Sequence, residues 1–244
     1  SWTERLALNN SVASNPFVSP SNTPPLWGVA YGNSTFVALG ESGSILTSPD
    51  GTTWTRRTTT FTYLLGGSST VSYREVTYGN GIFVAVGRAG GWANGFVITS
   101  TDGITWTNRT SNTSRSLNEV VYGNGTFVAV GSYATIITSP DGTTWTTTRT
   151  SNSETGFSGV GFGNNTFVAI ASGGNIVRST DNGTTWTAGS TGTSDSLFGI
   201  TFGNGTVVTV NWQGTILTSS DNGTTWTSRT SGTSKSLYGI TDVE

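Results

Sequence analysis

The strongest constraint on the fold is a repeated motif that places an aspartate, a glycine and a Thr-Trp pair within nine residues. It occurs as SPDGTTWT at residues 48–55 and 139–146, and in variant form at 100–107, 179–187 and 219–227. Its aspartates are separated by 52, 39, 40 and 40 residues and are Asp50, Asp102, Asp141, Asp181 and Asp221. Self-similarity at a nearly fixed period indicates a repeat architecture, in which each unit buries its apolar face against its neighbours.

A second motif precedes each copy of the first and completes five units. It begins with an aromatic residue followed by Gly-Asn, and its copies start at Tyr31, Tyr78, Tyr122, Phe162 and Phe202. Each unit predicts four short strands, as in the third unit, where residues 117–122 form the first strand and residues 136–139 the third. The Asn-Gly turn suits a tight hairpin, and the second strand, Phe-Val-Ala-Val, is apolar on both faces, as expected between two sheets. No stretch has helical periodicity with caps, so no helix is expected.

Four-stranded units at this period are typical of a β-propeller. The aspartate motif resembles that of the Asp-box, or BNR-repeat, β-propeller family, known from sialidases and from secreted bacterial propellers, over nearly all of residues 26–230. The resemblance implies an all-β propeller of four-stranded antiparallel blades with five full repeats, the motif lying between the third and fourth strands. The expected organisation is an N-terminal strand and extended tail over residues 1–25 and a propeller over 26–244.

The repeated residues are expected to be structural, because a catalytic group rarely occurs in every unit. The aspartate can accept hydrogen bonds from its own turn, and the glycine supplies a positive φ. The tryptophans should bury their rings between neighbouring sheets; they are Trp54, Trp106, Trp145, Trp186 and Trp226. The repeated arginines are expected to pair with carbonyls or motif aspartates; they are Arg57, Arg109 and Arg229. The N-x-Ser/Thr sequons at Asn33, Asn124, Asn204 and Asn222 are interpreted as turn chemistry in preference to glycosylation sites.

The units differ most at the turn between their second and third strands, which should share one end of the blades with the connections between units. The second unit has a longer loop here, over residues 88–95. Aromatic residues occupy this turn in three units, namely Trp92, Tyr133 and Trp212, and the long connection of residues 58–73 adds Phe61 and Tyr63. Such residues can stack on sugar rings or anchor a protein partner. The alternative is that they pack on one another or cover the central channel.

Both ends of the chain carry fragments of a repeat. Residues 2–5, Trp-Thr-Glu-Arg, copy a fourth strand, and residues 237–244 copy a first strand. Either the fragments meet within one molecule as a composite sixth blade, or they exchange between molecules, since an unpaired edge strand is a template for another chain. Candidate residues for this self-association are Trp2, Leu6, Leu8, Phe17, Val18, Tyr238 and Ile240.

The amino-acid composition argues against several classes of function. Only 10% of residues are charged, one of them a lysine, and the net charge is −2, so nucleic-acid binding is not expected. No apolar run reaches the roughly 18 residues of a membrane span. Without Cys or His there is neither thiolate nor imidazole for a zinc site or for nucleophile–base catalysis, and neither a metal nor a cofactor is expected. The absence of Met predicts a removed leader, and a surface of hydroxyls and amides favours a secreted or cell-surface protein.

Sialidase activity is not expected. The resemblance implies an arginine triad, a tyrosine nucleophile and an Arg-Ile-Pro motif, but this chain has no Arg-Ile-Pro and no visible arginine cluster. Photosystem assembly factors and xyloglucan-degrading enzymes also contain related propellers, in larger chains. The glutamates Glu41, Glu75, Glu119 and Glu154 are scattered, which leaves a carboxylate pair for glycoside hydrolysis open. The first hypothesis is therefore a secreted, non-enzymatic structural or adhesive propeller that self-associates through its terminal strands, into fibres. The alternative is a glycan-binding lectin that uses the aromatic loops, and the third is an Asp-box glycosidase.

Overall fold

The computed structural model describes residues 24–57, 71–89, 94–151 and 155–241. Within these ranges the protein is all-β, with five four-stranded antiparallel sheets in which the strands follow chain order. The helical elements in this part of the chain are two 3₁₀ turns, η1 (Glu41–Gly43) and η2 (Ser172–Gly174), so the predicted lack of α-helix holds here. In the same residues, no helix has the length and apolar character needed to cross a membrane.

Each sheet corresponds to one predicted unit and is called a blade. The first blade comprises β1 (Leu26–Gly32), β2 (Thr35–Gly40), β3 (Ile45–Ser48) and β4 (Thr55–Arg57). The second comprises β5 (Val71–Gly79), β6 (Ile82–Ala89), β7 (Asn94–Ser100) and β8 (Thr107–Arg109). The third comprises β9 (Leu117–Gly123), β10 (Thr126–Gly131), β11 (Thr135–Ser139) and β12 (Thr146–Arg149). The fourth comprises β13 (Phe157–Gly163), β14 (Thr166–Ala171), β15 (Asn175–Ser179) and β16 (Thr187–Ser190). The fifth comprises β17 (Leu197–Gly203), β18 (Thr206–Asn211), β19 (Ile216–Ser219) and β20 (Thr227–Arg229).

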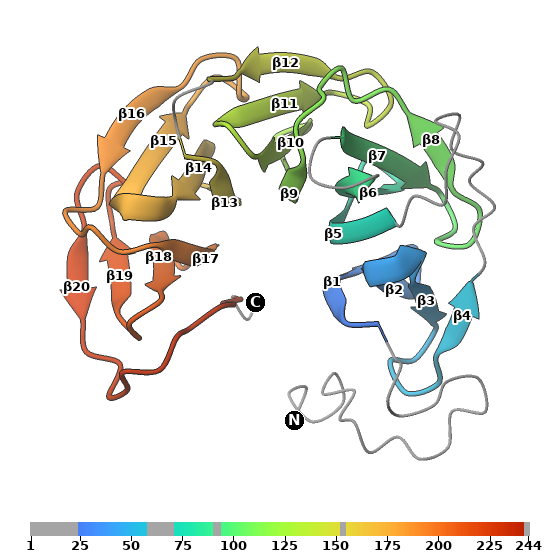
Figure 1. Cartoon of the computed structure of the whole chain (residues 1–244), viewed down its shortest axis with the longest axis horizontal. Helices are drawn as coiled ribbons and strands as arrows, with labels where there is room; N and C mark the ends of the chain where they lie inside the picture. Colours follow the sequence, from blue (N-terminus) through green and yellow to red (C-terminus); the bar gives the residue numbers. More distant parts are fainter. Residues whose placement is uncertain (1–23, 58–70, 90–93, 152–154, 242–244) are drawn as a thin grey trace.

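The blades stand side by side along an arc, with their first strands innermost and their fourth strands outermost (Figure 1). The innermost strands pack in chain order, β1 against β5, β5 against β9, β9 against β13 and β13 against β17. The first and fifth blades face one another across the opening of the arc (Figure 1). This arrangement confirms the β-propeller, whereas a sixth blade is not formed by the residues that the structure describes.

The apolar core lies between the blades. Val37 and Leu39 of the first blade pack with Val76 and Trp106 of the second, and equivalent clusters join each later pair of neighbours. Because the second strand of an inner blade is covered from both sides, residues 127–130 of β10 are completely buried. The continuous apolar character of these strands therefore follows from their position in the ring.

Asparagines connect consecutive blades at one end of the propeller. The Asn33 side chain donates to the Thr101 carbonyl of the next blade at 3.2 Å, and Asn124 donates to Asn182 at 2.7 Å. These bonds join the turn after a first strand to the Asp-containing turn of the following blade, so both turns lie at the same end, here called the Asp-turn end. The turns after the second strands lie at the opposite end, here called the mouth end.

The second blade departs from the expected pattern at its mouth end. Residues 88–95 were expected to form a loop, but Arg88 pairs with Gly95 and Ala89 with Asn94, so β6 and β7 continue as a longer hairpin. In other blades a residue with positive φ follows the second strand closely, as at Ser42 and Gly173. No residue with positive φ interrupts β6 up to Ala89, and the antiparallel pairing therefore continues.

Candidate functional site

Each motif aspartate is hydrogen-bonded within its own turn. In the third blade, Asp141 Oδ1 accepts hydrogen bonds from the backbone N–H groups of Thr143 and Thr144, both at 2.8 Å, and from the Ser139 hydroxyl at 2.9 Å. The other copies accept equivalent bonds. Hydrogen bonds to the ionised carboxylate lower its pKa, to about 2 in Asp181, chiefly through Thr185. The motif aspartates are thus occupied in holding their own turns.

In the second to fifth blades the tryptophan of the Asp-containing turn faces the preceding blade. Trp145 is 1% exposed, donates from Nε1 to the Gly142 carbonyl at 2.9 Å and packs with Val84 and Val86 of the second blade. A Cβ placed on Gly142 would lie 2.6 Å from Ile82 Cδ1, also in the second blade. Glycine is therefore required at position 142 for two reasons: the backbone has a positive φ of 71°, and the two blades approach too closely for a side chain.

The repeated arginines have a different partner from the one expected. Arg57, Arg109 and Arg229 each donate from Nε to a threonine hydroxyl on the neighbouring third strand, at 2.8, 2.8 and 3.0 Å. The expectation that they pair with carbonyls or motif aspartates is replaced by this contact. The reason is the register of the last hairpin, which lays the arginine stem alongside the third strand and away from the Asp turn.

The mouth end carries a group of exposed aromatic residues. Their side chains are between 45% and 67% exposed, and we call them the mouth aromatics: Trp27, Tyr133, Trp212 and Tyr238. Two arginines stack on them, with the Arg115 guanidinium 4.0 Å from the Tyr133 ring centroid and that of Arg74 5.3 Å from Trp27. The sequence predicted Tyr133 and Trp212 at this end, assigned Tyr238 to self-association and missed Trp27.

Tyr133 adopts an unfavourable backbone conformation. Its φ is 56° and that of Ala134 is 49°, whereas the corresponding turns contain Ser42 and Gly43, or two glycines. A left-handed conformation costs a non-glycine residue about 1–2 kcal/mol. The turn therefore presents the exposed Tyr133 side chain at a cost in backbone strain.

Several predicted site residues cannot be placed. Trp92, Phe61 and Tyr63, and the self-association candidates Trp2, Leu6, Leu8, Phe17 and Val18, lie outside the described residues. Tyr238 and Ile240 belong to a segment that runs beside β17. The Leu237 N–H donates to Asn211 at 3.1 Å, and a Cβ on Gly199 would lie 3.2 Å from Ile240 N. This segment therefore occupies the place of a following first strand.

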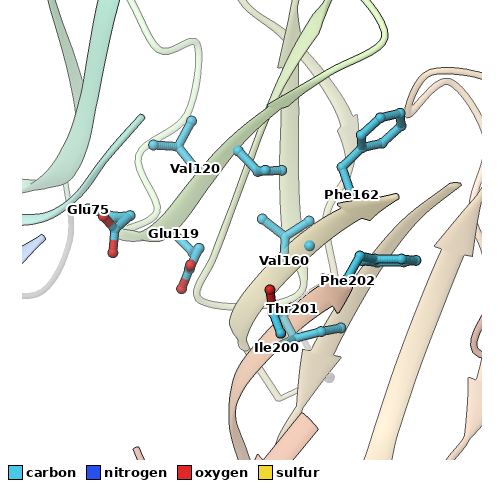
Figure 2. Close-up of a pocket in the computed structure, with 10 residues that line it drawn as sticks. Glu75, Glu119, Val120, Val160, Phe162, Ile200, Thr201 and Phe202 are labelled. Atoms are coloured by element: carbon cyan, nitrogen blue, oxygen red, sulfur yellow. The ribbon is translucent and has the colours of Figure 1, made fainter. Parts of the chain in front are cut away.

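Inside the arc, the first strands of the second to fifth blades surround a cavity of about 300 Å³. Glu75 and Glu119 lie at one end of it, side by side on neighbouring strands, and the apolar residues Val160, Ile200 and Phe202 form the other end (Figure 2). The Glu75 carboxylate accepts the Val76 N–H at 2.9 Å. In the part of the chain that the structure describes, no hydrogen bond reaches the Glu119 carboxylate and no three potential metal-ligating side chains come together.

Burial raises the pKa of both glutamates above the ordinary value of 4.5, and the nearby charge of Glu75 raises that of Glu119 further. Both side chains retain some accessible surface because they line the cavity, but protein surrounds them on the other sides. Two adjacent carboxyl groups in such a place ionise together only at a high cost, so they retain a proton near neutral pH.

The scattered glutamates of the sequence are thus partly brought together. Glu41 lies on η1 at the mouth end, away from the cavity, and Glu154 lies outside the described residues. A signal for the pair was present, because the residue three positions before the aromatic residue that begins the second motif is glycine in the first, fourth and fifth units and glutamate only in the second and third. Because the two units with glutamate at this position are consecutive, both carboxyl groups lie on neighbouring first strands.

Five blades of four antiparallel strands, whose first strands surround an inner cavity, define a β-propeller. A family model described as the DUF6242 beta propeller domain matches residues 68–200, and the chain belongs to this family. The likeness to the Asp-box family rests on the repeated motif alone. No curated protein matches the chain.

Solved structures share the fold at low sequence identity. YCF48 bound to D1 peptide is 20% identical with a TM-score of 0.61, and the match covers 84% of this chain and 66% of that one, just under two thirds. YCF48 from Cyanidioschyzon merolae is 18% identical with a TM-score of 0.64, over 88% of this chain and 76% of that one. A chain of a nidogen/laminin complex is 13% identical with a TM-score of 0.60, over 88% of this chain and 84% of that one.

Proposed function

We propose that this propeller is a non-enzymatic binding module that holds a segment of a partner protein across its mouth end. The observation that carries the proposal is the distribution of exposed large hydrophobic residues. Of the seven in the described part of the chain, four are the mouth aromatics. Exposed apolar side chains that gather at one place mark an interaction surface, whereas scattered ones are ordinary.

The chemistry of the mouth end suits a polypeptide. Tyrosine, tryptophan and arginine contribute most of the binding free energy in protein interfaces, and Arg74 and Arg115 already lie on aromatic rings here. The strained turn at Tyr133 holds its ring outward at a cost to stability. Two of the structures that share the fold were solved with a peptide or in a protein complex, which shows that such propellers accept protein partners.

A randomised peptide display library, with a glycan array beside it, tests this function. Peptides selected on the wild-type protein should lose binding to Trp212→Ala and retain it for Ile104→Ala, which removes another exposed apolar side chain, at the Asp-turn end. Selected peptides that bind both variants equally well would contradict the proposal. Glycans that bind the wild type but not Trp212→Ala would replace it with the lectin hypothesis.

Self-association is the second candidate, and it is favoured by a blade face that stays exposed among the described residues. Val29 and Tyr31 on β1 are 43% and 57% exposed, whereas Val76, which occupies the position of Val29 in the second blade, is 3% exposed against the preceding blade. At the other end of the arc, residues 237–241 take the position of a first strand. A second copy of the protein would cover the exposed face of β1 and pair with the segment of residues 237–241. Repetition of this contact would build a structural or adhesive assembly.

Light scattering and electron microscopy of the secreted or purified protein test this candidate. Wild-type oligomers or fibres should dissociate in Val29→Lys and after deletion of residues 1–25. A wild-type protein that stays monomeric at high concentration would exclude self-association.

The glycosidase hypothesis receives less support from the geometry. Glycoside hydrolysis requires two carboxyl groups that flank the scissile bond. Glu75 and Glu119 instead lie side by side at one end of the cavity, with apolar residues at the other end (Figure 2). Chromogenic glycosides should therefore remain uncleaved, and hydrolysis that Glu119→Gln abolishes would restore the hypothesis.

A further inference from the structure

The inner cavity has two chemically different ends. Glu75 and Glu119 supply carboxyl groups from β5 and β9, while Val160, Ile200 and Phe202 supply apolar surface from β13 and β17 (Figure 2). Among the described residues that line the cavity, the only side-chain hydroxyl is that of Thr201. A ligand that fits both ends must be cationic at one end and apolar along its stem.

The space for such a ligand is a consequence of the repeat. The unit position occupied by Glu75 and Glu119 is occupied by Gly159 and Gly199 in the next two blades. Glutamates in all four blades would fill this part of the channel with charge, whereas the glycines leave room in front of the apolar wall. At about 300 Å³, the cavity is at the lower end of the range for small-ligand sites and is large enough for one extended alkyl chain.

Among the described residues, the Glu119 carboxylate has no hydrogen-bonding or cationic partner. It lies deep in the channel and lines the cavity. Buried carboxylates are ordinarily paired or hydrogen-bonded, because leaving one alone costs free energy. An ammonium group would supply hydrogen-bond donors to both glutamates and offset the negative charge that burial otherwise disfavours.

We propose that this cavity is a binding site for an alkylammonium group, with the nitrogen between Glu75 and Glu119 and the alkyl stem against Val160, Ile200 and Phe202. The identification of its source as a lysine side chain of the bound polypeptide rests on the proposed function. The site itself does not, because a free alkylamine has the same chemistry. A divalent cation is a poorer match, since it requires about six oxygen ligands and tolerates no apolar wall.

The test is a titration of the full chain with butylammonium chloride, followed by the backbone amide signals in ¹H–¹⁵N NMR spectra. Saturable shifts are expected for the amides of Val120, Gly161 and Thr201, which line the cavity. Butan-1-ol, which has the same stem without the charge, should produce no saturable shifts. The Glu75→Gln/Glu119→Gln double variant should bind butylammonium at least about tenfold more weakly, because it loses two charge-assisted hydrogen bonds.

Glu41→Gln is the matched control, since it removes a glutamate that does not line the cavity, and it should bind butylammonium as the wild type does. Three results would overturn the inference: no saturable shift, equal binding by the double variant, or the same shifts produced more strongly by calcium chloride. If butylammonium binds but Trp212→Ala leaves peptide binding unchanged, the cavity site is retained and the proposed function is rejected. If butylammonium does not bind but Trp212→Ala abolishes peptide binding, only the cavity site is rejected.

Discussion

Gly28 of the first blade and Glu75 of the second are complementary in shape, since a Cβ on Gly28 would lie 2.7 Å from Glu75 Oε1 and 2.9 Å from Glu75 Cα. The side chain missing from one blade makes room for the carboxylate of the next. The acidic end of the cavity therefore depends on a residue that supplies no chemistry of its own.

Replacing Gly28 by alanine should destabilise the protein by about 1–3 kcal/mol, because the new methyl group meets backbone atoms that must shift. The measurement is the midpoint of urea unfolding. Gly239→Ala is the control, since a Cβ there has no neighbouring atom within 4 Å. Equal stability of the two variants would contradict the packing described for Gly28.

The paired glutamates predict a loss of stability as the pH rises. Their folded-state pKa values are raised above the ordinary 4.5, so the folded protein retains protons that the unfolded chain releases. The contribution of the two glutamates to the stability of the folded state is complete below pH 4.5. It is lost as the pH rises through their raised pKa values. The double Gln variant should be more stable than the wild type at neutral pH and should depend less on pH above 4.5. Parallel curves for the two proteins in thermal unfolding would refute this.

The motif aspartates act in the opposite direction. Their folded-state pKa values lie below the ordinary 3.8, so their contribution is present above pH 3.8 and is lost as the pH falls further. Thermal unfolding across the pH scale should therefore show greatest stability at weakly acidic pH. Asp141→Asn should weaken the acid limb of the curve, and an unchanged acid limb would show that the turn hydrogen bonds do not contribute.

Trp145 and Trp54 occupy the same position in different blades and should respond differently to truncation. Trp145 lies between the second and third blades, so Trp145→Ala should cost about 3–5 kcal/mol. Trp54 is only half-buried, since no preceding blade covers it in the described residues, and Trp54→Ala should cost clearly less. Unfolding by guanidinium measures both, and equal losses would indicate that another part of the protein covers Trp54.

Tyr133→Gly should separate stability from binding. Glycine adopts the φ of 56° without strain, so the variant should be about as stable as the wild type or up to about 1 kcal/mol more stable. It should at the same time bind selected peptides more weakly, because the stacked ring over which Arg115 lies is gone. Unchanged peptide affinity would remove Tyr133 from the binding surface.

The local features of the blades were predictable because they depend on short-range patterns that recur in every unit. The Asn-Gly hairpins, the Asp turns, the two-sided burial of the second strands and the number of full blades all follow from residues close together in the chain. The prediction of a loop over residues 88–95 was wrong at its two ends, where β6 and β7 remain paired. The composition of these residues suits a loop and a continued hairpin equally well.

The sequence by itself determined the repeating blade and its turns, whereas only the tertiary structure decided which residues meet between blades. Glu75 and Glu119 are 44 positions apart in the numbering, and they become neighbours because consecutive first strands pack side by side around the channel. Trp27 and Tyr238, at opposite ends of the described chain, reach the same end of the propeller for the same reason. Contacts of this kind depend on the packing of one blade against the next, which no pattern within a single unit contains.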